Sequence, residues 1–255
     1  MDHSFIVLAH RDSPFLPGCL KGLADQNARS RIAVSTSTPS PYIARAAQAV
    51  CAELCINPRA DGIAADWNFG LAQAKTRFVT LAHQDDTYAP GFAAKSLALF
   101  ARRPAGALCF TGYQEIDDAG APKSSKISKV KHLLERVTIG RREQVDGRRL
   151  LAFLSFGNPL PCSSVTFDRD KLPDFQFSPD WHSNLDWEAW WRLAKAGETF
   201  LHVPERLVGR RHNALTATSA LIADGTRRRE DLRMFRKAWP EPIAQAIAWA
   251  YRAGY

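Results

Sequence analysis

The N-terminal part of the chain alternates between short apolar runs and apolar stripes at helical spacing. Residues 5–10 (FIVLAH), 31–36 (RIAVST) and 77–82 (RFVTLA) are bounded by polar residues, the pattern of strands buried on both faces. A short extended piece is expected at 55–57. The intervening stripes predict three helices, on Leu16, Cys19, Leu20 and Leu23, on Ile43, Ala47, Val50 and Leu54, and on Ile63, Trp67, Leu71 and Ala74. This order favours a mainly parallel sheet with helices on both faces.

Two adjacent carboxylates, Asp85 and Asp86, directly follow the apolar run 77–82. Open α/β sheets bind ligands beyond the carboxyl ends of their strands, so this pair stands where a ligand is expected. Adjacent carboxylates repel each other, and Mg²⁺ or Mn²⁺ neutralises them while sharing oxygen ligands with substrate phosphates. The alternative is that the pair caps the helix expected over 92–100. From the pair alone, both interpretations stay open.

Composition identifies a folded globular chain with reduced cysteines. Its 255 residues are 45% hydrophobic and 24% charged, which excludes a disordered protein. Five cysteines, an odd number without CxxC spacing, argue against a disulfide framework and a zinc ribbon. Because no apolar run reaches the roughly 18 residues of a membrane span, we expect no signal peptide and no transmembrane anchor. These features predict a cytoplasmic protein.

The net charge of +8 comes from two short segments. Residues 123–149 hold nine Lys and Arg against three acids, and residues 227–237 hold six against two, so the remaining chain is close to neutral. Each segment is either a solvated basic surface or a contact for phosphates or an anionic membrane. No helix-turn-helix, zinc finger or aromatic RNA-binding pattern accompanies them, so we expect no nucleic-acid partner.

The succession of these parts resembles glycosyltransferase family 2 of the GT-A fold. The resemblance is carried, across residues 4–220, by FIVLAHRDSPFLPGCLKGL, GIAADWNFGLAQAKTRFVTLAHQDD, ALCFTGYQEIDDAG and SNLDWEAWWRLAKAGETFLHVPERLVGRRHNALTAT. It implies a Rossmann-like α/β domain over 1–220, with a mixed, mainly parallel sheet flanked by helices. Residues 121–150 are expected to form a basic loop over the cleft. Residues 221–255 are expected to form a C-terminal helical extension that packs on the body or rests on an anionic membrane.

The resemblance also implies roles for particular residues. Asp186, which opens the helix in LDWEAWWRLAKAG, stands where the family has its catalytic base, although it is also a good helix N-cap. The metal, Mn²⁺ or Mg²⁺, is expected on Asp85, Asp86 and His212. The alternative for His212, with Arg210 and Arg211, is a solvated basic turn. The nucleotide side of the cleft is expected to involve Ser35, Thr36, Asp66, Asn68, Arg210 and Arg211, of which Asp66 and Asn68 have helix capping as their alternative. Of the three tryptophans in the same helix, at least two are expected in the core.

The function implied is that of a metal-dependent inverting glycosyltransferase. It would move a sugar from a nucleoside-diphosphate sugar to a hydroxyl of a glycan or lipid-linked acceptor, in cell-surface polysaccharide or glycolipid synthesis. The expected location is the cytoplasm, with peripheral contact to the inner face of the membrane through the basic segments. An alternative is an inactive nucleotide- or glycan-binding module. It is motivated by Ser35, Thr36 and Ser37 in place of the family's usual acidic pair, and by His83 in place of the first metal-motif acid.

Overall fold

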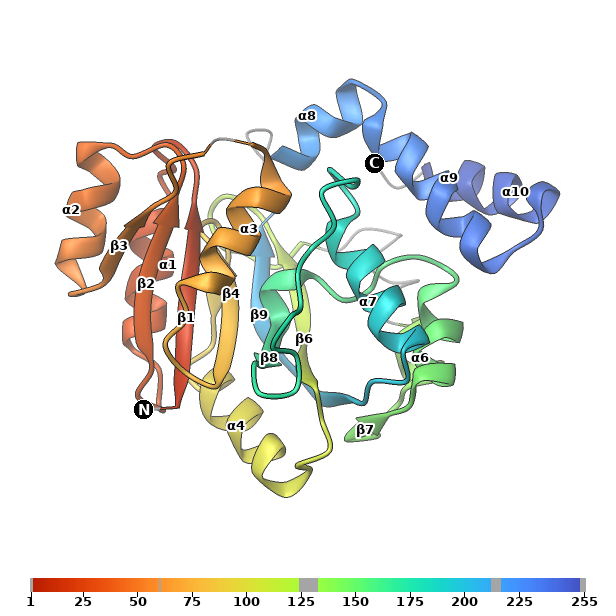
Figure 1. Cartoon of the computed structure of the whole chain (residues 1–255), viewed down its shortest axis with the longest axis horizontal. Coiled ribbons are helices and arrows are strands. Elements are labelled where there is room, and N and C mark those ends of the chain that lie inside the picture. The colour runs from red at the N-terminus through yellow and green to blue at the C-terminus, as the bar shows by residue number, and fades with distance from the viewer. Residues whose placement is uncertain (1, 60, 124–132, 212–216, 253–255) are drawn as a thin grey trace.

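The computed structural model describes residues 2–59, 61–123, 133–211 and 217–252 (Figure 1). Its strands are β1 His3–Ala9, β2 Arg31–Thr36, β3 Glu53–Ile56, β4 Phe78–His83, β5 Thr87–Tyr88, β6 Leu108–Ile116, β7 Gln144–Val145, β8 Val165–Asp168 and β9 Phe200–Arg211. Its helices are α1 Leu16–Ala24, α2 Pro41–Ala49, α3 Ile63–Ala72, α4 Phe92–Arg102, α6 Gly147–Leu154, the 3₁₀ turn η1 Cys162–Ser164, α7 Leu185–Lys195, α8 Ala217–Ala223, α9 Thr226–Ala238 and α10 Glu241–Arg252.

The strands form one mixed sheet in the order β3-β2-β1-β4-β8-β6-β9-β5, with β7 paired to β9. Strands β1, β2, β3 and β4 are mutually parallel, and β8 runs antiparallel between β4 and β6. Because β9 is parallel to β6, strands β1, β2, β4, β6 and β9 all point the same way. Their carboxyl ends therefore meet at one edge of the sheet, uppermost in Figure 1.

Each face of the sheet is covered by its own hydrophobic core. In β1, Phe5, Val7 and Ala9 contribute to the core under α1, α2 and α4, whereas Ile6 contributes to the core on the opposite face. That second core contains α3, α6, α7, α9 and α10 residues. The alternation follows from the period of two in a strand, and it buries both faces, which is why these strands are continuously apolar. The expected layered α/β architecture is confirmed.

The predicted elements before residue 120 correspond closely to the observed ones. The four apolar residues of the first stripe are the buried residues of α1, and the run 31–36 coincides with β2. One helix was predicted too long. Cys51 adopts φ 54° directly after α2, so the chain leaves the helix there, and Leu54 lies on β3 instead of on the α2 stripe.

The expected loop over 121–150 is not a continuous loop. Residues 133–138 are helical, β7 lies at Gln144–Val145, and α6 starts at Gly147. Leu150, Phe153 and Leu154 are buried at helical spacing, so apolar packing organises the end of this segment despite its charge. Residues 124–132, which hold three of its lysines, lie outside the described residues.

The C-terminal helices pack on the body of the protein. Met234 and Phe235 of α9 and Ala244 and Ala248 of α10 belong to the same core as α7. Within the described residues, none of the helices is both long and apolar enough to cross a membrane.

Candidate active site

Asp86 lies at the edge where the parallel strands end, in the turn between β4 and β5. The residue is buried, with 3% of its surface exposed, and its Oδ1 accepts a hydrogen bond of 2.9 Å from the backbone amide of Arg211. Its Oδ2 is buried and has no hydrogen-bond partner among the described residues. A buried carboxylate oxygen without a partner is costly, because desolvation is not offset. The site is therefore suited to a positively charged ligand at this oxygen.

Asp85 is electrostatically linked to the same site. Burial, followed by the negative charge of Asp86, raises the pKa of Asp85 above its usual value. The charges of His83 and Arg210 act in the opposite direction. The two carboxylates therefore repel each other, and the positive charge of Arg210 offsets part of that repulsion.

The Arg211 side chain closes this edge of the sheet. Its Nε donates to the backbone carbonyl of Asp85 at 2.9 Å, and its Nη1 donates to the carbonyl of Asp117 after β6. The guanidinium lies over the ring of Phe15, 4.3 Å from the centroid. Because these contacts go to carbonyls and an aromatic face, the positive charge of Arg211 is fixed in place without being paired by a carboxylate in them.

The buried thiol of Cys162 is affected by the charges of both Asp86 and Asp186. Burial raises the pKa of its thiol well above the usual value, and the negative charges of Asp186 and Asp86 raise it further. Both carboxylates thus act on one buried thiol in η1. Tyr88 lies in the same region, with its hydroxyl donating to the Ser163 carbonyl at 3.1 Å.

Asp186 lies in the first turn of α7, where the helix dipole favours a negative charge. Its Oδ1 accepts a hydrogen bond from the amide of Trp187 at 2.8 Å. The three tryptophans of α7 are all buried, and two of them donate their indole N–H to carbonyls, Trp187 to Leu154 and Trp190 to Leu160. The expectation that at least two tryptophans are in the core is confirmed.

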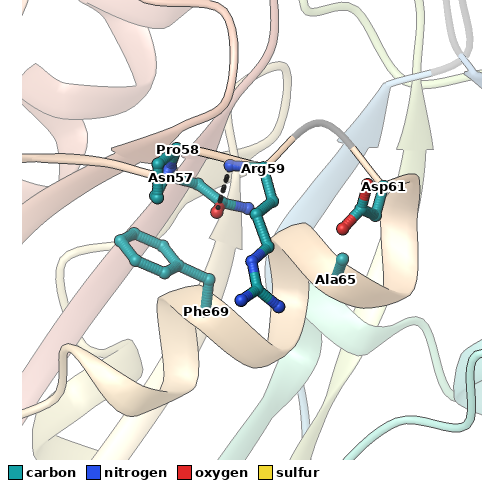
Figure 2. Close-up of a pocket in the computed structure, with 6 residues that line it drawn as sticks. All are labelled: Asn57, Pro58, Arg59, Asp61, Ala65 and Phe69. Carbon is teal, nitrogen blue, oxygen red and sulfur yellow. Dashed lines mark hydrogen bonds between the residues drawn. The ribbon is translucent and has the colours of Figure 1, made fainter.

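A second polar cluster lies at the carboxyl ends of β2 and β3. The carboxylate of Asp66, on α3, accepts hydrogen bonds from Ser37 Oγ at 2.8 Å and from Asn57 Nδ2 at 2.9 Å. Asn57 also lines a pocket of about 300 Å³ together with Pro58, Arg59, Asp61, Ala65 and Phe69. Figure 2 shows the Arg59 side chain extending along α3, with its amide bonded to Asn57 Oδ1. This pocket adjoins Asp66 and not the acidic pair.

The family assignment follows from the sequence comparison. The family model described as glycosyl transferase family 2 matches residues 4–163, more than half of the chain. The chain belongs to glycosyltransferase family 2. No curated protein sequence matches this glycosyltransferase.

Solved GT-A glycosyltransferases share the fold. The 1–349 portion of S. aureus TarS, in complex with UDP-GlcNAc, is 13% identical, with 97% of this chain and 70% of that chain covered and a TM-score of 0.67. The mannosyltransferase PcManGT from Pyrobaculum calidifontis, in complex with GDP-Man and Mn²⁺, is 15% identical. The match covers 98% of this chain and 69% of that chain, with a TM-score of 0.64. A longer TarS structure is covered over only 42% of its chain. At these identities the likeness concerns the fold.

In this family 2 glycosyltransferase, several residues expected at the site meet at one sheet edge. Hydrogen bonds join Arg211 to Asp85 and Asp86 there, and the charge of Arg210 acts on the pKa of Asp85. Asp186 lies in the first turn of α7, and its role as a base stays a prediction. His212 lies outside the described residues.

The expected nucleotide-side residues divide into two groups. Asp66 joins the polar cluster, whereas Asn68 forms two hydrogen bonds of 2.8 Å with the backbone of Phe177. Ser35 and Thr36 are both buried, and Thr36 Oγ1 accepts from the amide of Thr38 at 3.0 Å. Their roles in ligand binding stay predictions.

Sequence reasoning missed Ser37, Asn57, Arg59 and Cys162 as members of the site. Ser37 and Asn57 follow the ends of two parallel strands, so the strand-end rule that indicated Asp85 applies to them as well. Cys162 gave no sequence signal, because the burial of its thiol in η1 depends on the folded structure.

The acidic pair fits a hard divalent cation. Both candidate ligands are carboxylates, and Asp86 Oδ2 is buried without a partner in the described residues. In those residues no group of three or more His, Cys, Asp or Glu side chains is arranged to hold a metal. The remaining ligands would therefore be substrate phosphates and water, which is how Mg²⁺ is commonly bound.

Proposed function

We propose that this glycosyltransferase transfers a sugar from a nucleoside-diphosphate sugar to a hydroxyl group of a glycan or lipid-linked acceptor, with inversion at the anomeric carbon. The observation that carries the proposal is the buried Oδ2 of Asp86, which has no hydrogen-bond partner in the described part of the chain and lies on the residue whose Oδ1 is bound by the backbone of Arg211. An anionic leaving group needs positive charge at this point, and an acceptor hydroxyl needs a base.

The diphosphate is assigned to the sheet edge at Asp85 and Asp86. Arg210 and Arg211 supply positive charge there, and Asp85 and Asp86 would hold Mn²⁺ or Mg²⁺. When bound, the cation offsets the charge that develops on the departing diphosphate. His212 follows Arg211 directly in the sequence and is proposed as a further metal ligand.

The nucleoside end of the donor is assigned to the Asp66 cluster. Ser37, Asn57 and Asp66 lie at the ends of neighbouring strands and offer hydroxyl, amide and carboxylate groups for ribose or base. The pocket beside Arg59 adds a concave surface of suitable size for a base. These groups take the place of the acidic pair that the second strand lacks, and Ser35 and Thr36 support them from the buried end of β2.

In the transfer step, Asp186 accepts the proton of the acceptor hydroxyl. The acceptor oxygen forms a bond to the anomeric carbon while the bond from that carbon to the diphosphate breaks on the opposite face. The bonding electron pair leaves with the diphosphate, so charge builds up near Arg210 and Arg211. One displacement of this kind inverts the anomeric configuration.

The acceptor is proposed to be a growing cell-surface polysaccharide or a glycolipid. Contact with the inner face of an anionic membrane through the basic segments 123–149 and 227–237 would bring the enzyme to a lipid-linked acceptor.

A donor panel tests the proposed function. UDP-, GDP-, CDP- and TDP-linked sugars are incubated with the enzyme and Mn²⁺ or Mg²⁺, and nucleoside diphosphate release is measured with and without chelator. We expect metal-dependent release from one nucleotide class, abolished in Asp86→Asn. Tight nucleotide binding without release, with any acceptor fraction added, would instead support an inactive binding module.

A further inference from the structure

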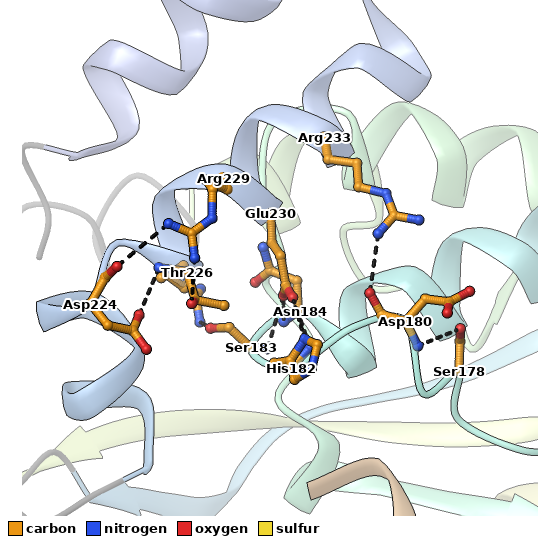
Figure 3. Close-up of polar contacts among 11 residues, drawn as sticks. Ser178, Asp180, His182, Ser183, Asn184, Asp224, Thr226, Arg229, Glu230 and Arg233 are labelled. Carbon is orange, nitrogen blue, oxygen red and sulfur yellow. Dashed lines mark hydrogen bonds and ion pairs between the residues drawn. The ribbon is translucent and has the colours of Figure 1, made fainter. Parts of the chain in front are cut away.

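Glu230 of α9 binds the chain segment that enters α7. Its carboxylate accepts three successive backbone amides, from His182 to Oε1 at 2.7 Å and from Ser183 and Asn184 to Oε2 at 2.9 and 2.8 Å (Figure 3). Only 6% of Glu230 is exposed. Hydrogen bonds from N–H groups to a carboxylate are roughly twice as strong as neutral ones, so this buried group fixes the segment firmly.

The segment needs such a partner because its own capping is incomplete. Asn184 is the N-cap of α7, but it makes no side-chain capping bond within the described residues. Its side chain donates to Asp231 Oδ1 at 2.9 Å instead. The amides before the first helical turn are therefore satisfied from α9, and Asp186 comes two residues after the last of them.

Each residue from 180 to 184 contacts α9. Arg233 donates to the Asp180 carbonyl at 3.1 Å and lies 4.1 Å from the centroid of the Trp181 ring, while Glu230 binds the next three residues. A run of consecutive contacts restricts the backbone more than any single bond, because it leaves no residue free to rotate.

α9 also lies within electrostatic reach of Asp186. Burial alone lowers the pKa of Arg227, but the negative charges of Asp231, Tyr251 and Asp186 outweigh it and raise the pKa above the usual value. Arg227 Nη1 also donates to Ser183 Oγ at 3.3 Å. The helix that binds the entry segment thus also carries a partly buried cation whose pKa is affected by the charge of the proposed base.

We propose that Glu230 is a positioning residue for catalysis, through which the C-terminal extension holds Asp186 in the orientation that accepts the acceptor proton. This inference rests on the proposed function. Proton transfer requires the base within hydrogen-bond reach of the reacting hydroxyl, and small displacements of such a group reduce the rate strongly. Residues 221–255 are then part of the catalytic unit, although they lie beyond the 4–163 region matched by the family model.

The test compares Glu230→Gln with Glu241→Gln. The first variant keeps the shape of the side chain but turns an amide NH₂ toward backbone N–H donors. The second removes an exposed carboxylate from the same extension, where it pairs with Arg236. Amide hydrogen exchange at residues 182–184, the Kd of the donor nucleotide, KM and kcat are measured for each folded variant.

We expect Glu230→Gln to accelerate exchange at residues 182–184 at least tenfold and to lower kcat by about 10- to 100-fold, with the donor Kd changed less than twofold. Glu241→Gln should match wild type in all four measurements. Because a general loss of stability also lowers activity, each mutation is repeated in the Asp186→Asn background. There, Glu230→Gln should lower the residual rate no further, since the group that it positions has been removed.

Three results would overturn the inference, and they distinguish its failure from the failure of the proposed function. An active wild type with unchanged kcat in Glu230→Gln, or equal losses in the wild-type and Asp186→Asn backgrounds, refutes the positioning role and leaves the proposed function intact. A wild type that releases nucleoside diphosphate from none of the donors refutes the proposed function and the inference together.

Discussion

The backbone amide of Arg211 lies 2.9 Å from Oδ1 of Asp86, joining the end of β9 to the turn after β4 across 125 residues of sequence. This bond orients the acidic side chain so that its second oxygen stays without a partner in the described structure. The donor is a backbone group, so the bond persists when the Arg211 side chain is replaced. Substitutions of Arg211 therefore isolate the contribution of its guanidinium.

Arg211→Ala should weaken binding of the nucleoside diphosphate about 10- to 100-fold, because a charge-assisted contact to phosphate contributes about 1.5–3 kcal/mol. Calorimetric titration measures this loss. Arg211→Lys should recover only part of the affinity, since an ammonium cannot reach the carbonyls of Asp85 and Asp117 together as the planar guanidinium does. Equal affinity in Arg211→Ala and wild type would exclude a diphosphate at this edge.

Asp186→Asn should lower kcat by about 10²- to 10⁴-fold, the usual contribution of a general base, while the Kd of the donor changes little. The amide retains the size of the side chain and its bond to the Trp187 backbone, so the fold should be preserved. Steady-state rates with the best donor measure the loss of catalysis, and a thermal melt shows whether the fold is preserved. A variant with unimpaired kcat would show that Asp186 is only a helix-terminal residue.

Gly147→Ala should destabilise the protein by about 1–3 kcal/mol, the typical cost of overpacking. A Cβ at Gly147 would lie 2.4 Å from the Ala194 carbonyl oxygen, where α6 approaches α7. The control is Gly18→Ala in α1, where a Cβ meets nothing within 4 Å. That change should be neutral or stabilise by about 0.5–1 kcal/mol through helix propensity. Urea denaturation measures the free energy of unfolding of both variants. Equal stability of the two would contradict the close approach of α6 to α7.

Stability should fall on acidification because His3 is buried in its neutral form. Its ring nitrogens bond to Ser30 Oγ at 2.8 Å and Thr80 Oγ1 at 3.1 Å, and burial lowers its pKa from 6.5 to about 3. Between those values the unfolded chain binds a proton that the folded chain does not. The free energy of unfolding therefore decreases as pH falls through this window, by at most about 1.4 kcal/mol per pH unit from this group.

The measurement for His3 is urea unfolding of wild type and His3→Gln at pH 7.5 and pH 5.5. Other titrating groups contribute equally to both proteins, so the difference between their pH slopes isolates His3. We expect a shallower slope in the variant. Parallel slopes would mean that the pKa of His3 is the same in the folded and unfolded states.

The sheet and the candidate site at its edge could be predicted because buried parallel strands carry a local signal. Continuous apolar runs marked β1, β2 and β4, and the acids after β4 followed from the strand-end rule. The extent of α2 was less predictable, since the positive φ of Cys51 ends the helix within an apolar stripe that continues to Leu54. Tertiary structure overrides a helical pattern wherever the chain must turn into a strand.

Long-range polar contacts could not be predicted from the sequence. Asn68 bonds to Phe177 across 109 residues, and Glu230 binds amides 46 to 48 residues earlier. Both side chains sit on helices whose patterns only indicate amphipathicity, and neither pattern specifies the partner. The charge of 123–149 likewise obscured α6, whose buried Leu150 and Phe153 follow helical spacing. Charged residues on one face of a helix do not prevent the opposite face from packing.

The most direct test of the account is calorimetric titration of UDP, GDP, CDP and TDP, each with Mn²⁺, Mg²⁺ or chelator. The proteins are wild type, the double variant Asp85→Asn with Asp86→Asn, and Asp170→Asn. Asp170 is exposed beyond β8, at the opposite end of the sheet, and pairs with Arg77, so it is a matched control. We expect metal-dependent binding of one nucleotide to wild type and Asp170→Asn, lost in the double variant. Nucleotide binding that is equally strong in the double variant, or in chelator, would contradict a diphosphate and cation at Asp85 and Asp86.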